Sequence, residues 1–135
     1  MTTKLAEGLT KTERIEVDDS RTISFMGDEG RVYATPELVR DVEIACRNLL
    51  LECIDEGQDS VGTHIDISHT AATPIGMWAE ITVTVDAVDG RAVRFDVTGK
   101  DPVDNICRGS HSRFIVDVDK TLARVKEKAS SVKAA

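Results

Sequence analysis

Concentrated positive charge is what this sequence most clearly lacks. Its formal net charge at pH 7 is −7, and no basic run occurs before the C-terminal end. Nucleic acids and anionic membranes bind through basic patches, so neither is an expected partner. No apolar run approaches the roughly 20 residues that cross a bilayer, and residues 1–10 lack the apolar core of a signal peptide. The expected location is the cytoplasm.

The cysteines and glycines also do not form the sequence patterns of a disulfide framework, a metal site or a nucleotide-binding loop. There are three cysteines, an odd number, with Cys46 and Cys53 on one probable helix and Cys107 far away, so we interpret them as small core residues. No Cys/His cluster or paired acidic motif offers a metal site, and the glycines do not form a nucleotide-binding loop. We therefore expect no metal and no cofactor.

What remains is the composition of one globular domain. The chain has 135 residues, of which 41% are hydrophobic and 30% are charged. This length closes a single core and is too short for two. We expect one domain over residues 1–135, with a disordered tail from about residue 129.

A long helix is predicted near the middle of the chain. Thr35 is a capping residue, Pro36 suits the first helical position, and Glu37 places an acid in the first turn. The helix is expected to run to about Glu56 and to end at Gly57. Its apolar positions cover nearly half the circumference, with Glu37, Asp41, Asn48, Glu52 and Asp55 opposite, so it should be deeply embedded. The apolar positions are Leu38, Val39, Val42, Ala45, Cys46, Leu49, Leu50, Cys53 and Ile54.

Strands follow the helix. Runs rich in β-branched residues predict them at 61–69, 77–88, 91–99 and 106–116. Asp89-Gly90 is typical of a tight antiparallel hairpin. Further expectations are an edge strand at 12–17, a turn at 18–20, an irregular segment at 25–34 and a short amphipathic helix at 119–128. The order indicates an α+β layer in which one helix crosses a curved antiparallel sheet, which is the arrangement of a hotdog domain.

Three polar residues stand out against this framework. Glu43 lies at the edge of the apolar arc, where it either extends toward Arg40 or Arg47 or is a partly desolvated carboxylate for nucleophilic or general-base chemistry. Strand alternation puts His69 on the same face as Ile65 and Ile67, either as a structural histidine or as a functional one. Thr35 is interpreted as the helix N-cap, beside unpaired amides that favour a developing negative charge.

The spacing of these residues resembles the fluoroacetyl-CoA thioesterase family of the hotdog superfamily. Its members carry a threonine, a glutamate eight residues later and a histidine twenty-six residues after that, and Thr35, Glu43 and His69 keep both intervals. The glutamate is followed by Ile44-Ala45-Cys46, which also matches. The stretch Gly62-Thr63, five residues, then Ser68-His69-Thr70-Ala71-Ala72-Thr73-Pro74-Ile75-Gly76 resembles the strand and turn around the family's catalytic histidine.

The resemblance implies an acyl-CoA thioesterase that acts on a small or medium acyl group. It implies catalytic roles for Thr35, Glu43 and His69, and substrate binding by Gly62 and by Arg113, which lies in a Gly-x-His-x-Arg-like stretch. Glu43 or a Glu43-activated water would attack the thioester carbonyl. Thr35 would position or activate that group, and His69 would transfer the proton. The resemblance also implies a homodimer with its sites at the subunit interface.

Other interpretations stay open. The rival function is a non-catalytic acyl-CoA binding or sensing module on the same fold, and a hotdog hydratase is disfavoured because its Asp/His dyad motif is absent. His64 and His111 are interpreted as structural. The resemblance weakens at residues 25–35, where Met26 and Glu29 stand at positions that align with aromatic lid residues of the fluoroacetyl-specific enzyme. Selectivity for fluoroacetyl-CoA is therefore not expected.

Overall fold

The computed structural model describes residues 3–132. Two single 3-10 turns, η1 (Asp19–Arg21) and η2 (Asp28–Gly30), interrupt the N-terminal region. In chain order the strands and α-helices are β1 (Thr10–Glu16), β2 (Thr22–Ile23), β3 (Val32–Tyr33), α1 (Thr35–Leu51), β4 (Gln58–His69), β5 (Trp78–Asp89), β6 (Ala92–Lys100), β7 (Asn105–Asp117) and α2 (Val118–Ser130).

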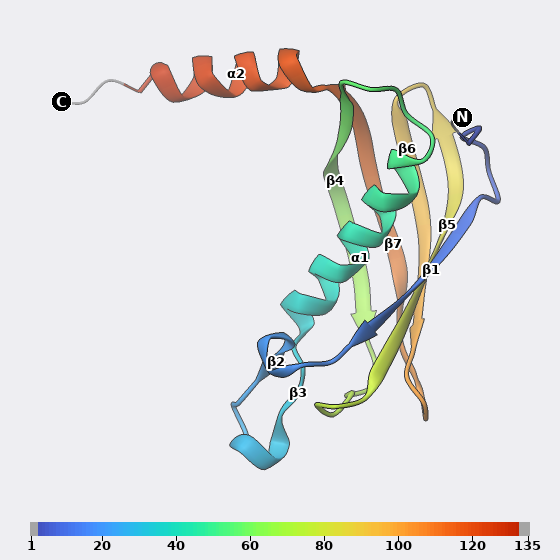
Figure 1. Cartoon of the computed structure of the whole chain (residues 1–135), viewed down its shortest axis with the longest axis vertical. Helices are drawn as coiled ribbons and strands as arrows, with labels where there is room; N and C mark the ends of the chain where they lie inside the picture. The colour runs from blue at the N-terminus through green and yellow to red at the C-terminus, as the bar shows by residue number, and fades with distance from the viewer. Residues whose placement is uncertain (1–2, 133–135) are drawn as a thin grey trace.

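The architecture is one helix across one antiparallel sheet. Five strands pair in the order β1-β5-β6-β7-β4, and α1 crosses one face of the curved sheet (Figure 1). Strands β2 and β3 form a separate small ribbon at the N-terminal end of α1. The predicted α+β hotdog arrangement is confirmed. The predicted hairpin is also confirmed, because β5 and β6 pair directly and Gly90 takes a positive φ of 59° in their turn.

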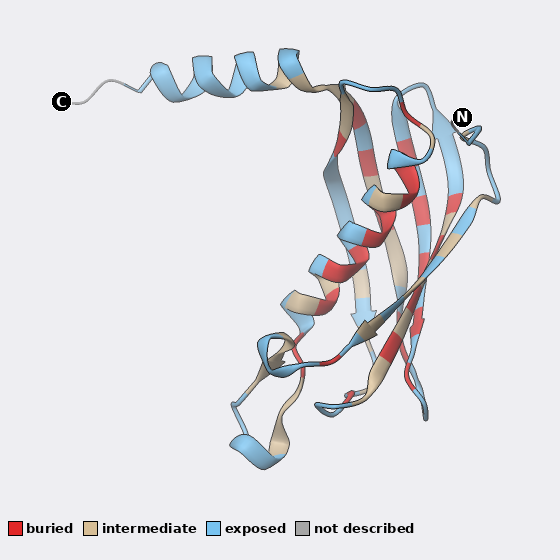
Figure 2. Cartoon of the chain, viewed as in Figure 1, coloured by how far each residue is buried: buried red, intermediate tan, exposed pale blue. Residues whose placement is uncertain are grey.

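The core lies between α1 and the sheet. Burial is concentrated on the inner side of α1 and on alternate residues of β5 and β6 (Figure 2). This alternation follows from the two-residue period of a strand whose single covered face packs on a helix. All three cysteines are free. Cys46 and Cys107 are buried core residues as expected, whereas Cys53 is only partly buried and lies outside the core cluster.

Three sequence-based expectations for α1 need correction. The helix ends at Leu51 rather than near Glu56, because Cys53 donates to the Leu50 carbonyl and the chain turns toward β4. Ala34, not Thr35, occupies the N-cap position, and no side chain caps the helix. Asp41 is buried rather than solvent-facing. It lies three residues after Leu38 and four before Ala45, so it borders the apolar face of the helix.

Strand β4 forms one edge of the sheet. It pairs only with β7, and its residues 61–66 are exposed in the single chain. Two apolar side chains of this strand, Val61 and Ile65, are each 42% exposed. An edge strand with exposed apolar side chains is a surface that folded proteins usually cover.

Helix α2 extends away from the domain past the β4 edge, and none of its residues is buried (Figures 1 and 2). It continues to Ser130, two residues past the predicted end of this helix, and residues 133–135 of the expected tail lie outside the described part of the chain. No helix within residues 3–132 has the length and apolar character needed to cross a membrane.

Candidate active site

Thr35 and His69 meet where α1 begins and β4 ends. Thr35 is the first residue of α1 and His69 is the last residue of β4. The hydroxyl oxygen Oγ1 of Thr35 lies 2.8 Å from Nδ1 of His69, within hydrogen-bond distance. The Thr35 hydroxyl therefore contacts the histidine instead of capping the helix.

The imidazole of His69 is partly shielded from water. Its Nε2 atom is buried and has no hydrogen-bond partner within residues 3–132. Burial lowers the pKa of His69 below its ordinary value of 6.5, and the backbone of Ala71 opposes this shift. The ring is therefore neutral at pH 7 and able to accept a proton.

A largely apolar cavity of about 520 Å³ opens beside this pair. Ile23, Phe25 and Val32 contribute to its walls, together with Thr35 and His69. This volume falls in the range of small-molecule sites. The cavity therefore has a polar pair that can act on a reacting bond, and apolar walls that can hold an acyl group.

Hydrogen bonds to β7 and to Asp101 hold the turn after His69 in place. The Thr70 amide donates to the Ile106 carbonyl at 2.7 Å. The Thr73 hydroxyl donates to the Asp101 carboxylate at 2.8 Å, and both of these residues are buried. A turn held in this way presents its backbone to the cavity in one conformation.

Glu43 lies at a second, separate depression of about 300 Å³, which Gly62 and His111 also line. Its side chain is 50% exposed, and Oε1 is 3.3 Å from Nη1 of Arg113. Among the described ion pairs, Arg40 pairs with Glu37 and Arg47 with Asp59, not with Glu43. Glu43 is half-exposed and held by Arg113, which is compatible with the partly desolvated carboxylate of the functional interpretation. Its catalytic role stays a prediction.

Gly62 keeps the space beside this carboxylate open. A Cβ atom at Gly62 would lie 3.4 Å from Oε1 of Glu43 and 3.1 Å from Cε1 of His111. The second distance is tighter than ordinary van der Waals contact. An added side chain would therefore crowd His111 and come into contact with the Glu43 carboxylate.

Arg113 is 3% exposed and pairs with Glu43 behind this second depression. Its Nε donates to the Ser60 hydroxyl at 2.7 Å, and its Nη2 donates to the Ser60 carbonyl at 2.8 Å. Nη1 lies 3.2 Å from Nε2 of His111. With its donors engaged inside the protein, Arg113 orients Glu43 and His111.

The structural interpretation of His111 agrees with its contacts. Its Nδ1 is 2.7 Å from the backbone carbonyl of His64, and the ring is buried. Burial lowers the pKa of His111 below 6.5. His111 nevertheless borders Gly62 and Glu43, a position that its place in the sequence did not indicate.

The predicted site residues therefore form two groups in one chain. Thr35 and His69 are together, while Glu43, Gly62 and Arg113 are together elsewhere. Thr35 and Glu43 are eight residues apart on α1, which corresponds to about 12 Å along the helix axis. Glu43 cannot reach a bond that lies against His69 of its own chain without a large rearrangement.

Sequence reasoning missed a third group, in which Tyr33 packs against His69 and binds Asp41. Phe25, which lines the cavity, was also missed. The signal for Asp41 was its position beside Leu38 and Ala45 on the helix. No cluster of three metal-ligating side chains occurs within the described residues.

Solved structures define the class of protein. The fluoroacetyl-CoA thioesterase superposes with a TM-score of 0.86 at 30% identity, covering 93% of this chain and 98% of that one. A thioesterase superfamily member from Thermus thermophilus superposes with a TM-score of 0.83 at 26% identity, covering 94% and 97%. The fold is that of a hotdog thioesterase.

The sequence defines the family. Residues 17–119 match the fluoroacetyl-CoA-specific thioesterase family. The fluoroacetyl-CoA thioesterase of Streptantibioticus cattleyicolor is 36% identical over 97 residues, which are 72% of this chain and 70% of that protein. This chain belongs to the fluoroacetyl-CoA-specific thioesterase family, and the prediction of a thioester hydrolase is confirmed.

Proposed function

We propose that this protein hydrolyses small or medium acyl-CoA thioesters to the free acid and CoA, and that it does so as a homodimer. The observation that carries the proposal is the Thr35–His69 hydrogen bond at the mouth of an apolar cavity, in a chain of this family. A variant of the related fluoroacetyl-CoA enzyme has been solved with fluoroacetate and CoA. The expected cytoplasmic location of this protein stays a prediction.

The homodimer is proposed because one chain does not assemble the predicted constellation. Antiparallel pairing of β4 with its twin would cover the exposed Val61 and Ile65. The two-fold axis of that pairing carries each Glu43 toward the end of the sheet where the other chain has His69. Each complete site then contains Thr35 and His69 of one subunit and the Glu43 group of the other.

In this site the three residues divide the reaction. Glu43 removes a proton from the water that attacks the thioester carbonyl, or it attacks that carbonyl itself and water then hydrolyses the acyl-Glu43 anhydride to the free acid. Thr35 positions the reacting group, and neutral His69 relays the proton that the departing CoA sulfur takes up as the carbon–sulfur bond breaks. Gly62, which has no side chain, lets the thioester approach the backbone beside Glu43.

Arg113 supports this chemistry from inside the protein. Its charge keeps the Glu43 carboxylate in place, and its bonds to Ser60 fix its own position. Because Arg113 is buried, we assign it to orientation of the carboxylate and not to direct contact with the phosphates of CoA.

The test is release of free thiol from a panel of short, branched, aromatic and long acyl-CoAs. Glu43→Gln and His69→Ala should each lower turnover by at least about a hundredfold, because each removes a nucleophilic or proton-transfer group. Circular dichroism should show that both variants stay folded. Near wild-type turnover in either folded variant would contradict the assignment. A protein that binds acyl-CoA without releasing thiol would instead support the binding-module alternative.

A further inference from the structure

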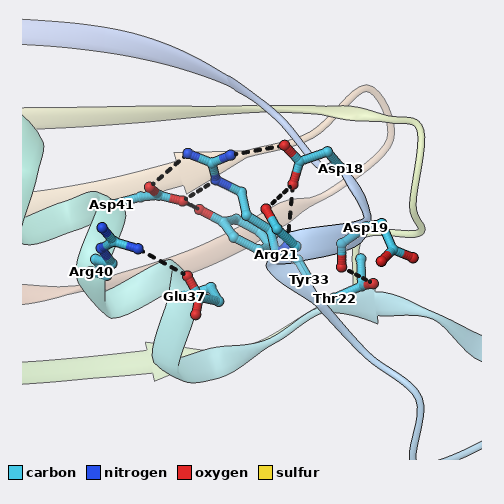
Figure 3. Close-up of polar contacts among 9 residues, drawn as sticks. Asp18, Asp19, Arg21, Thr22, Tyr33, Glu37, Arg40 and Asp41 are labelled. Carbon is cyan, nitrogen blue, oxygen red and sulfur yellow. Dashed lines mark hydrogen bonds and ion pairs between the residues drawn. The ribbon is translucent and has the colours of Figure 1, made fainter.

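A buried carboxylate lies one layer behind the catalytic pair. Asp41 on α1 is 3% exposed. Arg21 donates to it twice, from Nε to Oδ2 at 3.0 Å and from Nη2 to Oδ1 at 3.3 Å. The Tyr33 hydroxyl also donates to Oδ2 of Asp41 (Figure 3). A charge this deeply buried is expensive unless it is fully paired, and here three donors pair it.

Tyr33 connects this group to the active site. Its ring is 1% exposed and lies edge-on to the His69 ring, with centroids 6.4 Å apart and planes at 78°. Its amide donates to the Thr73 carbonyl at 2.8 Å, so its backbone is attached to the turn that follows His69. Tyr33 also lines the acyl cavity.

The imidazole of His69 has few other restraints. Within the described residues Nδ1 bonds the Thr35 hydroxyl and Nε2 has no partner, while the backbone of Ala71 also lies close enough to affect the ring. One hydrogen bond fixes the position of Nδ1 but leaves the tilt of the ring to its packing. The Tyr33 ring, nearly perpendicular to the imidazole, contributes to that packing.

We propose that Tyr33 is a positioning residue for His69, and that Asp41 and Arg21 hold Tyr33 in the orientation that this requires. The proposal rests on the proposed function of His69. Burial and the hydrogen bond to Asp41 raise the pKa of Tyr33, so its hydroxyl stays protonated and keeps donating to Asp41. Asp41 accepts on one oxygen from Tyr33 and Arg21 together, which couples the ring on β3 to helix α1 and to η1.

Arg21 also connects the Asp41–Tyr33 pair to the wall of the acyl cavity. It lies two residues before Ile23 and four before Phe25, which both line the acyl cavity. The Arg21 carbonyl accepts the Ala34 amide at 2.9 Å, so the same residue also joins the start of this segment to the helix N-terminus. The Arg21–Asp41–Tyr33 group therefore fixes one cavity wall and the catalytic histidine together.

Three variants separate these contributions. Tyr33→Leu removes the ring beside His69, Tyr33→Phe keeps the ring and removes the hydroxyl, and Asp41→Asn keeps both but removes the carboxylate charge. The matched control is Glu80→Gln, which breaks the Arg14–Glu80 ion pair on β1 and β5, away from the site. Turnover, KM and the pH dependence of turnover are measured on acetyl-CoA, and the His69 ring is titrated by NMR.

Tyr33→Leu should lower kcat roughly 10- to 100-fold with a smaller change in KM, because misplacement of a catalytic group penalises the chemical step. Removal of the ring also exposes the imidazole, so the pKa of His69 should rise toward 6.5. Asp41→Asn should also lower kcat and raise the pKa of His69, but by less than Tyr33→Leu, and Tyr33→Phe should have the smallest effect. Glu80→Gln should leave kcat and the pKa of His69 unchanged.

The outcome is decided even if one variant fails to fold, because Asp41→Asn and Tyr33→Phe retain the ring. A folded set in which stability falls but kcat and the His69 titration do not change would overturn the proposal, since a purely structural role predicts that result. The NMR titration does not depend on activity. A wild-type protein that hydrolyses no thioester therefore contradicts the proposed function while leaving the positioning of His69 open to direct test.

Discussion

Replacement of Arg113 by methionine tests the second half of the active site. The guanidinium is 3% exposed and donates to the hydroxyl and the carbonyl of Ser60, and it also faces His111 and Glu43. Methionine has a similar length and apolar character, so the variant removes the charge and the hydrogen bonds without opening a large cavity. What it leaves behind is a buried Ser60 carbonyl that has lost its side-chain donor.

The magnitude follows from these contacts. Loss of a charged donor from a buried carbonyl and hydroxyl costs about 1–3 kcal/mol for each group left unsatisfied. The Glu43 ion pair adds little to the free energy of unfolding, because the carboxylate is half-exposed and screened by solvent. The sum is about 3 kcal/mol, which for a domain of this size lowers the melting temperature by roughly 10 °C.

The assay is thermal denaturation together with steady-state hydrolysis of acetyl-CoA. We expect a lower melting temperature and a lower kcat, because Glu43 loses its orienting partner. A variant that melts like the wild type but shows a KM for acetyl-CoA raised by tenfold or more, with kcat unchanged, would refute this reasoning. It would show that Arg113 contacts the substrate.

Two further predictions concern pH and selectivity. Burial lowers the pKa of His69 and of His111 below 6.5, so their neutral forms stabilise the fold above that pH. The melting temperature should therefore fall as the pH is lowered from 7.5 to about 5.5. A higher melting temperature at pH 5.5 than at pH 7.5 would contradict this prediction. Phe25, which lines the cavity, is 88% exposed and the next residue, Met26, is 73% exposed. The entrance is therefore open, and discrimination between acetyl-CoA and fluoroacetyl-CoA should stay within roughly 10- to 200-fold. A ratio of kcat/KM values near ten thousandfold would contradict this.

Much of the fold could be predicted because its elements carry strong local signals. The two-residue alternation of β5 and β6 and the Asp89-Gly90 turn determine their hairpin, and the Thr35-Pro36 pair locates the start of α1 to within one residue. The C-terminal end of α1 could not be located in the same way. The apolar pattern continues past Leu51 as far as Gly57. The helix nevertheless ends at Leu51, because the chain must turn there to begin β4 at Gln58.

The candidate site was predicted in its residues but not in its arrangement. The spacing of Thr35, Glu43 and His69 identifies a family, but sequence intervals do not say which atoms meet. The helix rise separates Thr35 from Glu43, while β4 returns His69 to Thr35. The role of Asp41 could not be assigned, because the helical pattern placed it opposite the apolar arc, where acids are usually solvated, and its partners come from η1 and β3.

The division of the active site between two subunits can be tested by mixing Glu43→Gln with His69→Ala protein. If each site takes His69 from one chain and Glu43 from the other, a mixed dimer contains one intact site and one doubly substituted site. Unfolding and refolding equal amounts together should then restore about a quarter of wild-type turnover, because half of the dimers are mixed and half of their sites are intact. If Glu43 and His69 act within one chain, every site in the mixture carries one substitution. Turnover no higher than that of the two inactive parents would contradict the account.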